Sequence, residues 1–283
     1  MFKYPRFDED GLKVLTSVKD GIDADMLMDI SVRRLAVGKK LTFFSADAET
    51  AVLLLDGAVR FAAADVNAYP NGESAHPAAC FDEVAARNGI FADLPVTAHV
   101  AAGCPLTVEA VADAEILIAS AANARAFPPK LYRKSDVICT VSCEGLWENT
   151  AVRDVNTIFD YDNAPHSNLV IGEVLARQGR WWSYVPHSHP QPEVYYYKFD
   201  RKEGFGAGFI DDEAHTVKDG SAGCFPGGKT HVQVTAPGYP MYCCWIIRHL
   251  KDNPWLKTRT VHPDFAWLEN KKLNRRITAT LLA

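Results

Sequence analysis

The chain has 283 residues, of which 48% are hydrophobic and 23% charged, the composition of a folded globular protein with one large or two compact domains. Its 30 basic and 35 acidic residues leave a net charge of −5, so there is no basic field to attract nucleic acid or an anionic membrane surface. Apolar runs such as residues 51–55 are far shorter than the roughly 20 residues of a membrane-spanning helix. The first ten residues include early acids and no apolar segment, so no targeting peptide is predicted and a cytoplasmic protein is expected.

The first half of the chain is predicted to consist mainly of short strands. Runs of β-branched, aliphatic and aromatic residues are separated by turn pairs such as Asp56-Gly57 and Glu144-Gly145, a pattern typical of antiparallel sheets. Strands are expected at residues 30–32, 41–44, 51–55, 59–61, 96–100, 106–108, 116–118 and 137–141. Residues 81–87 are compatible with a helix.

The second half repeats this organisation after a polar, turn-rich segment at 160–168. Its strands are expected at residues 169–174, 181–184, 194–199, 205–210, 215–217, 232–235 and 242–248. A charged helix is expected at 266–276. We therefore predict an all-β protein with two β-sandwich or barrel domains, 1–158 and 159–283, and few peripheral helices.

Four potential metal ligands occur at regular spacing in the second half. His187-Ser188-His189 places two imidazoles on one face of a strand, and Glu193 follows four residues later. Gly220, Pro226, Gly228 and His231 then form the pattern G-x5-P-x-G-x2-H. The two patterns resemble the two-part signature of the cupins, whose three histidines and one glutamate converge on one divalent metal inside a small β-barrel. This ligand set suits zinc first, with manganese, iron or nickel as alternatives.

A weak internal repeat suggests that the first half is a degenerate copy of the second. Residues 103–108 have the spacing of residues 228–233, but Leu106 stands where the second copy has His231. The first half also lacks an H-x-H pair. We therefore expect a bicupin in which only the C-terminal domain binds metal.

Longer segments resemble one family, the 5-deoxy-glucuronate isomerases of inositol catabolism, which are related to the 5-keto-4-deoxyuronate isomerases. The similarity is carried mainly by Trp-Ser-Tyr-Val-Pro leading into His187, by Glu193-Val-Tyr-Tyr, and by residues 151–155, 169–174, 226–231 and 259–264. The resemblance implies a metal-dependent aldose–ketose isomerase that converts 5-deoxy-glucuronate, a sugar acid, to 5-keto-2-deoxygluconate. It also implies that His187, His189, Glu193 and His231 are the metal ligands.

Candidate proton-transfer and substrate-binding residues lie beside these motifs. If Glu193 faces inward, strand alternation turns Tyr195 and Tyr197 the same way, so these three form the predicted catalytic set. Gln233 shares the strand parity of His231 and could hold a substrate hydroxyl. A carboxylate substrate calls for a basic partner. Arg248 at the end of an apolar strand is the first choice, and the others are Arg180, Arg153 and Lys229.

Three other functions remain open on the sequence. The first is isomerisation of 5-keto-4-deoxyuronate from pectin breakdown, which uses the same metal and chemistry. The second is a metal-dependent dioxygenase, because the same ligands can hold iron with open positions for oxygen. The third is a sugar-binding cupin without catalysis. Aromatic-rich strands with edges to cover also make a homo-oligomer plausible.

Overall fold

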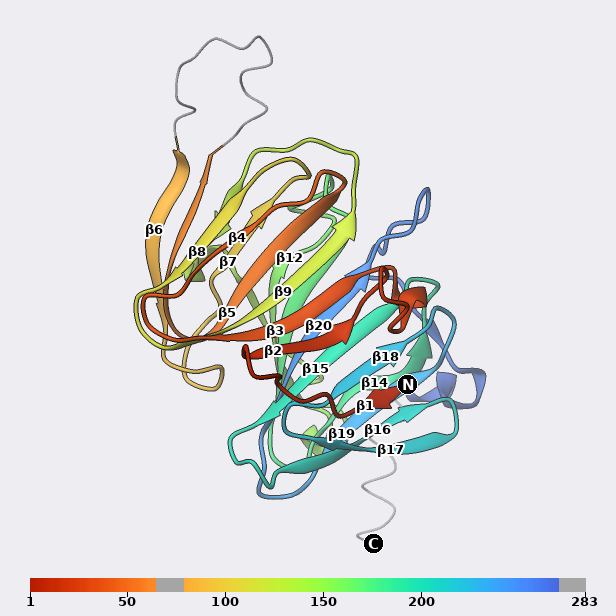
Figure 1. Cartoon of the computed structure of the whole chain (residues 1–283). Coiled ribbons are helices and arrows are strands. Elements are labelled where there is room, and N and C mark those ends of the chain that lie inside the picture. The colour runs from red at the N-terminus through yellow and green to blue at the C-terminus, as the bar shows by residue number, and fades with distance from the viewer. Residues whose placement is uncertain (65–78, 270–283) are drawn as a thin grey trace, which may run out of the picture.

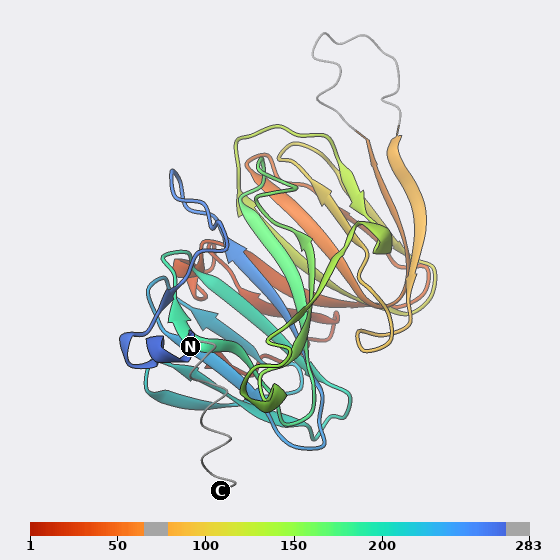
Figure 2. The ribbon, with the colours of Figure 1, turned by 180° about the vertical axis from the view of Figure 1, so that it is seen from behind.

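The computed structural model describes residues 1–64 and 79–269. Antiparallel strands form two curled β-modules that lie side by side (Figure 1), which confirms the predicted all-β fold. Figure 2 shows the same two modules from behind. The helices of the described residues are short 3-10 segments: η1 (Ala24–Met26), η3 (Lys134–Asp136), η4 (Trp147–Asn149) and η5 (Pro263–Glu269). Helices with the length and hydropathy of a membrane span are absent from the described residues.

The N-terminal module is one nine-stranded sheet that curls around its own core. A long strand, β5 (Ala48–Ala64), pairs along its length with four others. The main path of this sheet is β10 (Lys130–Tyr132), β7 (Thr97–Val100), β5, β9 (Ala114–Ala122), β3 (Asp29–Leu35) and β2 (Leu12–Thr16). Its remaining strands are β4 (Lys40–Phe43), β6 (Ala79–Arg87) and β8 (Leu106–Ala110).

The C-terminal module consists of two sheets that face each other. The seven-stranded sheet has the order β1 (Phe2–Lys3), β18 (Ala222–Phe225), β15 (Glu193–Phe199), β20 (Met241–Arg248), β13 (Leu169–Ala176), β12 (Arg153–Phe159) and β11 (Ile138–Ser142). The five-stranded sheet has the order β17 (Glu213–Lys218), β16 (Phe205–Ile210), β19 (His231–Thr235), β14 (Trp181–Ser188) and β21 (Thr260–Val261).

Strand alternation divides the apolar residues among three cores. On β15, Tyr195 and Tyr197 point into the C-terminal module, whereas Val194 and Tyr196 point into a core between the two modules. On β5, Val52 and Leu54 likewise fill the N-terminal module, while Leu53 and Leu55 face the other module. Each of these strands is therefore buried on both faces, which explains its nearly continuous apolar sequence.

Two predicted elements need correction. Residues 81–87 are not helical, because they lie in β6, which pairs with β5. Phe81 and Ala85 are buried, whereas Asp82 and Val84 are exposed, the period of two that a strand requires. Of the helix predicted at 266–276, residues 266–269 belong to η5, and the rest lies outside the described residues.

The predicted boundary at 158/159 falls inside the seven-stranded sheet. β12 ends at Phe159 and pairs with β13, and β11 pairs with β12. These two strands of the first half therefore belong to the sheet of the C-terminal module. β1 joins the same sheet through β18, so the start of the chain also packs on that module.

The short sequence repeat has a structural counterpart. Gly103 and Gly228 both have positive φ, at 78° and 86°, a conformation that glycine adopts without a steric penalty. In each copy a strand begins three residues later, at Leu106 in β8 and at His231 in β19. Leu106 is fully buried in the N-terminal core. An apolar side chain therefore occupies in the first module the position that a histidine has in the second.

Candidate metal centre

The second module brings the predicted ligands together from three strands. His187 lies near the end of β14 and pairs directly with His231, the first residue of β19. His189 follows β14, and Glu193 opens β15 on the facing sheet. All four residues are at least nine-tenths buried. The H-x-H-x3-E spacing is therefore the length of chain needed to turn from one sheet to the other.

The side chains of three of these residues converge within metal-binding distance of one another. Glu193 Oε2 lies 3.2 Å from His189 Nε2 and 3.2 Å from His231 Nε2. The potential ligand atoms of these three residues all lie within 4.8 Å of one another. The ring of His187 lies beside them, with its centroid 4.9 Å from that of His231 and 6.3 Å from that of His189.

Backbone carbonyls determine which nitrogen of each imidazole carries the proton. Nδ1 of His187 donates to Val185 O at 2.7 Å, and Nδ1 of His189 donates to Gln191 O at 2.8 Å. His231 Nδ1 donates to Lys229 O at 3.2 Å. Because a carbonyl can only accept, each neutral ring keeps its proton on Nδ1 and leaves the Nε2 lone pair free. This is the tautomer that metal coordination through Nε2 requires.

The free lone pairs make the cluster electrostatically incomplete without a cation. In the neutral tautomers of His189 and His231, two acceptor nitrogens lie 3.2 Å from an acceptor oxygen of Glu193. The Nε2 of His231 is buried and has no hydrogen-bond partner. Acceptors at this separation repel unless a positive charge lies between them. The donor set of two imidazole nitrogens and one carboxylate, with the His187 ring beside it but outside this group of atoms, therefore fits a divalent metal ion.

The same surroundings favour the ionisation states that bind metal. Burial lowers the pKa of His187 to about 3, and the charge of His231 adds to this effect, so the ring is neutral at pH 7. Burial alone would raise the pKa of the Glu193 carboxyl, but protons on the facing nitrogens of His189 and His231 outweigh burial and lower it to about 2, and the same contact raises the pKa of His189. A divalent cation between these groups would take the place of those protons. A neutral imidazole and an ionised carboxylate are the forms that coordinate metals.

A cavity of about 360 Å³ opens onto this cluster. His187, His189 and Glu193 form part of its wall. Three basic side chains, those of Arg153, Lys257 and Arg259, also line it. The other lining residues are Ser142, Val155, Val174, Trp182, Ser183, Tyr195, Trp245, Ile247 and Trp255.

The two predicted catalytic tyrosines differ in their position relative to this cavity. Tyr195 lines it, and burial together with the charge of Glu193 holds the pKa of its hydroxyl well above the ordinary value. Tyr197 is fully buried and does not line it. Its hydroxyl donates to Gln233 Oε1 at 3.2 Å. Gln233 is also fully buried and is not part of the cavity wall.

The arginines favoured from the sequence lie elsewhere. The guanidinium of Arg248 donates to the carbonyls of Asn168, His249 and Ala122, so it caps loops between the modules and does not line the cavity. Arg180 lines a separate surface hollow with Glu144 and Arg177. Arg153 does line the metal-side cavity, whereas Lys229 pairs with Asp211 and does not.

The basic residues that sequence reasoning missed come from the segment after β20. Lys257 and Arg259 precede the two-residue strand β21, which pairs with the end of β14 at His187 and Ser188. Neither residue belongs to the two-part metal signature. Arg259 does open the segment 259–264, which carries part of the family resemblance. This resemblance is the one sequence feature that could have identified Arg259 as a site residue.

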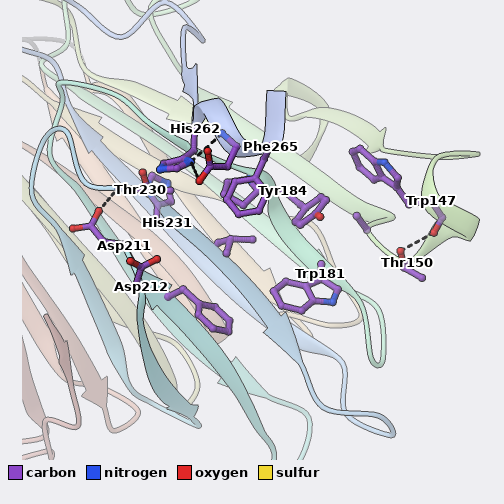
Figure 3. A pocket seen from close by; sticks show the side chains of 15 residues that line it. Trp147, Thr150, Trp181, Tyr184, Asp211, Asp212, Thr230, His231, His262 and Phe265 are labelled. Atoms are coloured by element: carbon purple, nitrogen blue, oxygen red, sulfur yellow. Dashed lines mark hydrogen bonds and ion pairs between the residues drawn. The ribbon is translucent and has the colours of Figure 1, made fainter. Parts of the chain in front are cut away.

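A larger cavity of about 840 Å³ is lined by aromatic and acidic side chains. Figure 3 shows its aromatic wall, which includes Trp147, Trp181 and Tyr184. Its acidic residues are Asp211, Asp212 and Asp264. His231 also belongs to its wall, but the other three predicted ligands do not. A sugar acid would be repelled by these carboxylates and attracted by the basic residues of the smaller cavity.

Comparisons with known proteins agree with this site and fold. A model described as the KduI/IolB family matches residues 2–268. Two relatives named 5-deoxy-glucuronate isomerase are each 28% identical. The one from Shouchella clausii aligns over 63% of this chain and 73% of its own length, and the one from Geobacillus kaustophilus over 68% and 72%.

Solved structures show the same architecture. An IolB-like protein from Salmonella typhimurium LT2 matches with a TM-score of 0.79 and 18% identity, over 95% of this chain and 99% of its own. The oxalate decarboxylase of Lactobacillus farciminis matches with a TM-score of 0.62 and 12% identity, over 87% of this chain and 83% of its own. These likenesses identify the fold as a bicupin, as predicted from the metal signature.

Proposed function

Because the chain belongs to the KduI/IolB family, we propose that it is a metal-dependent aldose–ketose isomerase that converts 5-deoxy-glucuronate to 5-keto-2-deoxygluconate. The observation that carries this proposal is the convergence of His189, Glu193 and His231 beside His187, next to a cavity that Arg153, Lys257 and Arg259 also line. The names of the two relatives support the same substrate. Together they favour a sugar acid over a neutral sugar.

The four predicted ligands would hold one divalent cation. When bound, it would supply Lewis acidity to a sugar carbonyl and the adjacent hydroxyl. The isomerisation also needs a proton to leave one carbon and another to reach its neighbour. Tyr195 is the side chain best placed to exchange protons, since it lines the cavity beside Glu193. Glu193 would then act mainly by holding the metal.

The choice of metal and the cellular setting belong to the same proposal. Three imidazoles and one carboxylate suit zinc, so we place zinc first and manganese, iron and nickel after it. The substrate would assign the enzyme to myo-inositol catabolism in the cytoplasm. Leu106, buried where a ligand would stand, supports an N-terminal module that binds no metal.

We also propose that the protein associates with further copies of itself. β11 forms an edge of the seven-stranded sheet, and on it Ile138 and Val141 are 47% and 49% exposed. An open edge with exposed apolar side chains favours pairing with another chain. A homo-oligomer is therefore expected, and sedimentation of the purified protein measures it.

The test is metal content followed by turnover without oxygen. The unsubstituted protein should hold about one equivalent of metal by elemental analysis and should isomerise 5-deoxy-glucuronate anaerobically. His187→Ala should lose both properties. His262→Ala is the matched control, because His262 lines the larger cavity and is not a predicted ligand.

Each other outcome points to a different function. Equal metal in the unsubstituted protein and in His187→Ala would reject the ligand set. Bound metal without turnover of 5-deoxy-glucuronate would reject the substrate, and turnover of 5-keto-4-deoxyuronate would then identify the related isomerase. Oxygen consumption would indicate a dioxygenase, and sugar binding without turnover a non-catalytic cupin.

A further inference from the structure

The metal-side cavity contains a row of side chains that leads from Glu193 to a basic residue. On the seven-stranded sheet, Glu193 and Tyr195 of β15 line the cavity, and Trp245 of β20 pairs with Tyr195. Val174 of β13 and Val155 of β12 continue the row across the sheet and pair with each other. Glu193 thus lies at one end of a continuous row of cavity-lining side chains on this sheet.

Arg153 lies on β12, the strand at the other end of this row. It is the first residue of β12, two residues before Val155, so both side chains project from the same face of the sheet. On the neighbouring strand, Arg153 pairs with Ser142, which also lines the cavity. Glu193 and Arg153 thus line the same cavity from two strands of one sheet that are separated by β20 and β13.

Arg153 differs from the other two cations of the cavity in its partners. Lys257 contacts two carboxylates, with Nζ 2.9 Å from Asp160 Oδ2 and 2.6 Å from Asp162 Oδ2. Arg259 lies 3.3 Å from Glu269 Oε1. Arg153 donates only to neutral acceptors, Cys143 Sγ at 3.2 Å and Ala151 O at 3.1 Å. Among the described residues that line this cavity, it is the cation without a carboxylate partner.

The hollow around Arg153 extends beyond the metal-side cavity. A second cavity, of about 320 Å³, shares Ser142, Arg153 and Arg259 with it. These shared residues lie where the two cavities adjoin, so Arg153 lines both of them. Arg259 reaches the same place from the segment before β21, which puts two guanidinium groups at the junction.

We propose that Arg153 binds the carboxylate of the substrate and that it determines the preference for a sugar acid over a neutral sugar. This inference rests on the proposed isomerase function, because it names the recognition element of the same site. In 5-deoxy-glucuronate the aldehyde and the carboxylate are at opposite ends of a six-carbon chain. A guanidinium can bind a carboxylate through two parallel hydrogen bonds, and Arg153, which has no carboxylate partner among the described residues, can make this contact. Arg259, which already contacts Glu269, adds positive charge nearby.

The experiment compares an acid with its neutral counterpart. We would measure kcat and KM with 5-deoxy-glucuronate and with 5-deoxy-glucose, in which a CH₂OH group replaces the carboxylate. Arg153→Gln should lower kcat/KM for the acid by roughly 10- to 100-fold, the value of a charge-assisted hydrogen-bonded pair. It should leave the neutral sugar and the metal content unchanged. Arg177→Gln, which removes an exposed arginine paired with Asp154, is the matched control and should change neither substrate.

The outcomes separate this inference from the proposed function. An unchanged preference for the acid in Arg153→Gln would overturn the role of Arg153. If the unsubstituted protein isomerises neither compound, the proposed function fails, and calorimetric binding of glucuronate and glucose to the metal-loaded protein becomes the test. Selective loss of glucuronate binding in Arg153→Gln would still support the inference, and equal binding would overturn it. If Arg153→Gln fails to fold, Arg153→Lys replaces it, because lysine keeps the positive charge but cannot donate two parallel hydrogen bonds. Arg153→Lys should reduce the preference for the acid by a smaller factor than the roughly 10- to 100-fold expected of Arg153→Gln.

Discussion

Arg87 and Glu173 join the two β-modules through a two-pronged ion pair in which neither side chain has any exposed surface. Arg87 is on β6 of the first module, and its Nη1 and Nη2 lie 2.7 Å and 2.8 Å from the two carboxylate oxygens of Glu173 on β13. The guanidinium also donates to Leu54 O and Asp93 O, and the hydroxyl of Tyr242 donates to Glu173. The charges are thus both paired and hydrogen-bonded, the condition under which a protein tolerates buried ions.

Removing one charge of this pair should be far more damaging than removing both. Glu173→Gln leaves the Arg87 charge buried without compensation, and we expect it to lower the free energy of unfolding by about 3–5 kcal/mol. The double variant Arg87→Met/Glu173→Leu removes both charges and should be closer to the unsubstituted protein than Glu173→Gln is. Urea unfolding of the three proteins measures this. A double variant less stable than Glu173→Gln would show that the pair itself is the main source of stability.

The proximity of some candidate ligands could be predicted from the sequence, because short-range geometry determines it. The H-x-H spacing places His187 and His189 near one another, and alternation turns Tyr195 inward with Glu193, as the core memberships bear out for Tyr195. The convergence of His231 on the same cluster required the known signature, since spacing alone does not reveal which strands pair. The pairing register of β14 and β19 sets His231 opposite His187 and so brings it to the cluster.

Two of the three cations of the cavity, Lys257 and Arg259, could not be predicted in the same way, whereas Arg153 was among the sequence candidates. Arg248 ends an apolar strand that passes the site, but its guanidinium caps the carbonyls of Asn168 and Ala122 at the module junction. Arg259 reaches the cavity from an irregular segment with no periodicity. The helix predicted at residues 81–87 is wrong for a related reason. Pairing with β5 overrides the local helix preference of alanine, glutamate and arginine.

Gly172 leaves the space that Trp245 occupies in the metal-side cavity. A Cβ at Gly172 would lie 2.3 Å from Cζ2 of the Trp245 indole, so Gly172→Ala must displace a ring that lines the cavity. We expect a loss of stability of about 1–3 kcal/mol from overpacking and a lower kcat/KM with unchanged metal content. The smaller ring of Trp245→Phe should restore stability when the two changes are combined. Additive losses in the double variant would contradict the clash.

Glu49 should make stability depend on acid pH through a second buried cluster between the modules. Its carboxylate lies 2.8 Å from His99 Nε2 and accepts hydrogen bonds from Ser167 Oγ at 2.8 Å and the Asn168 backbone N–H at 2.6 Å. Burial alone would raise the pKa of Glu49, but these hydrogen bonds and the charge of His99 outweigh it and lower the pKa from the usual 4.5. A lowered folded-state pKa contributes stability above pH 4.5, and this contribution is lost as the pH falls through the folded value.

The unfolding free energies of the unsubstituted protein and Glu49→Gln, measured from pH 7 to pH 3, test this prediction. The variant should be less stable at pH 7, and the difference should shrink below about pH 4.5 as the native carboxylate becomes protonated. Ser167→Ala, which removes one neutral donor, should give a smaller difference. A gap between the unsubstituted protein and Glu49→Gln that widens on acidification would mean that burial, and not hydrogen bonding, governs this carboxyl.

Tyr195→Phe should separate proton transfer from metal binding. Tyr195 lines the cavity beside Glu193, so removal of its hydroxyl should lower kcat by about 10²- to 10³-fold. Metal content and KM should change little, because the ring still fills the space against Trp182 at a centroid distance of 5.0 Å. Tyr197→Phe provides the comparison, since its hydroxyl is committed to Gln233 and does not line the cavity. A larger loss of kcat in Tyr197→Phe than in Tyr195→Phe would transfer the proton-exchange role to the deeper tyrosine, whereas loss of metal in Tyr195→Phe would show that the hydroxyl supports the ligands instead.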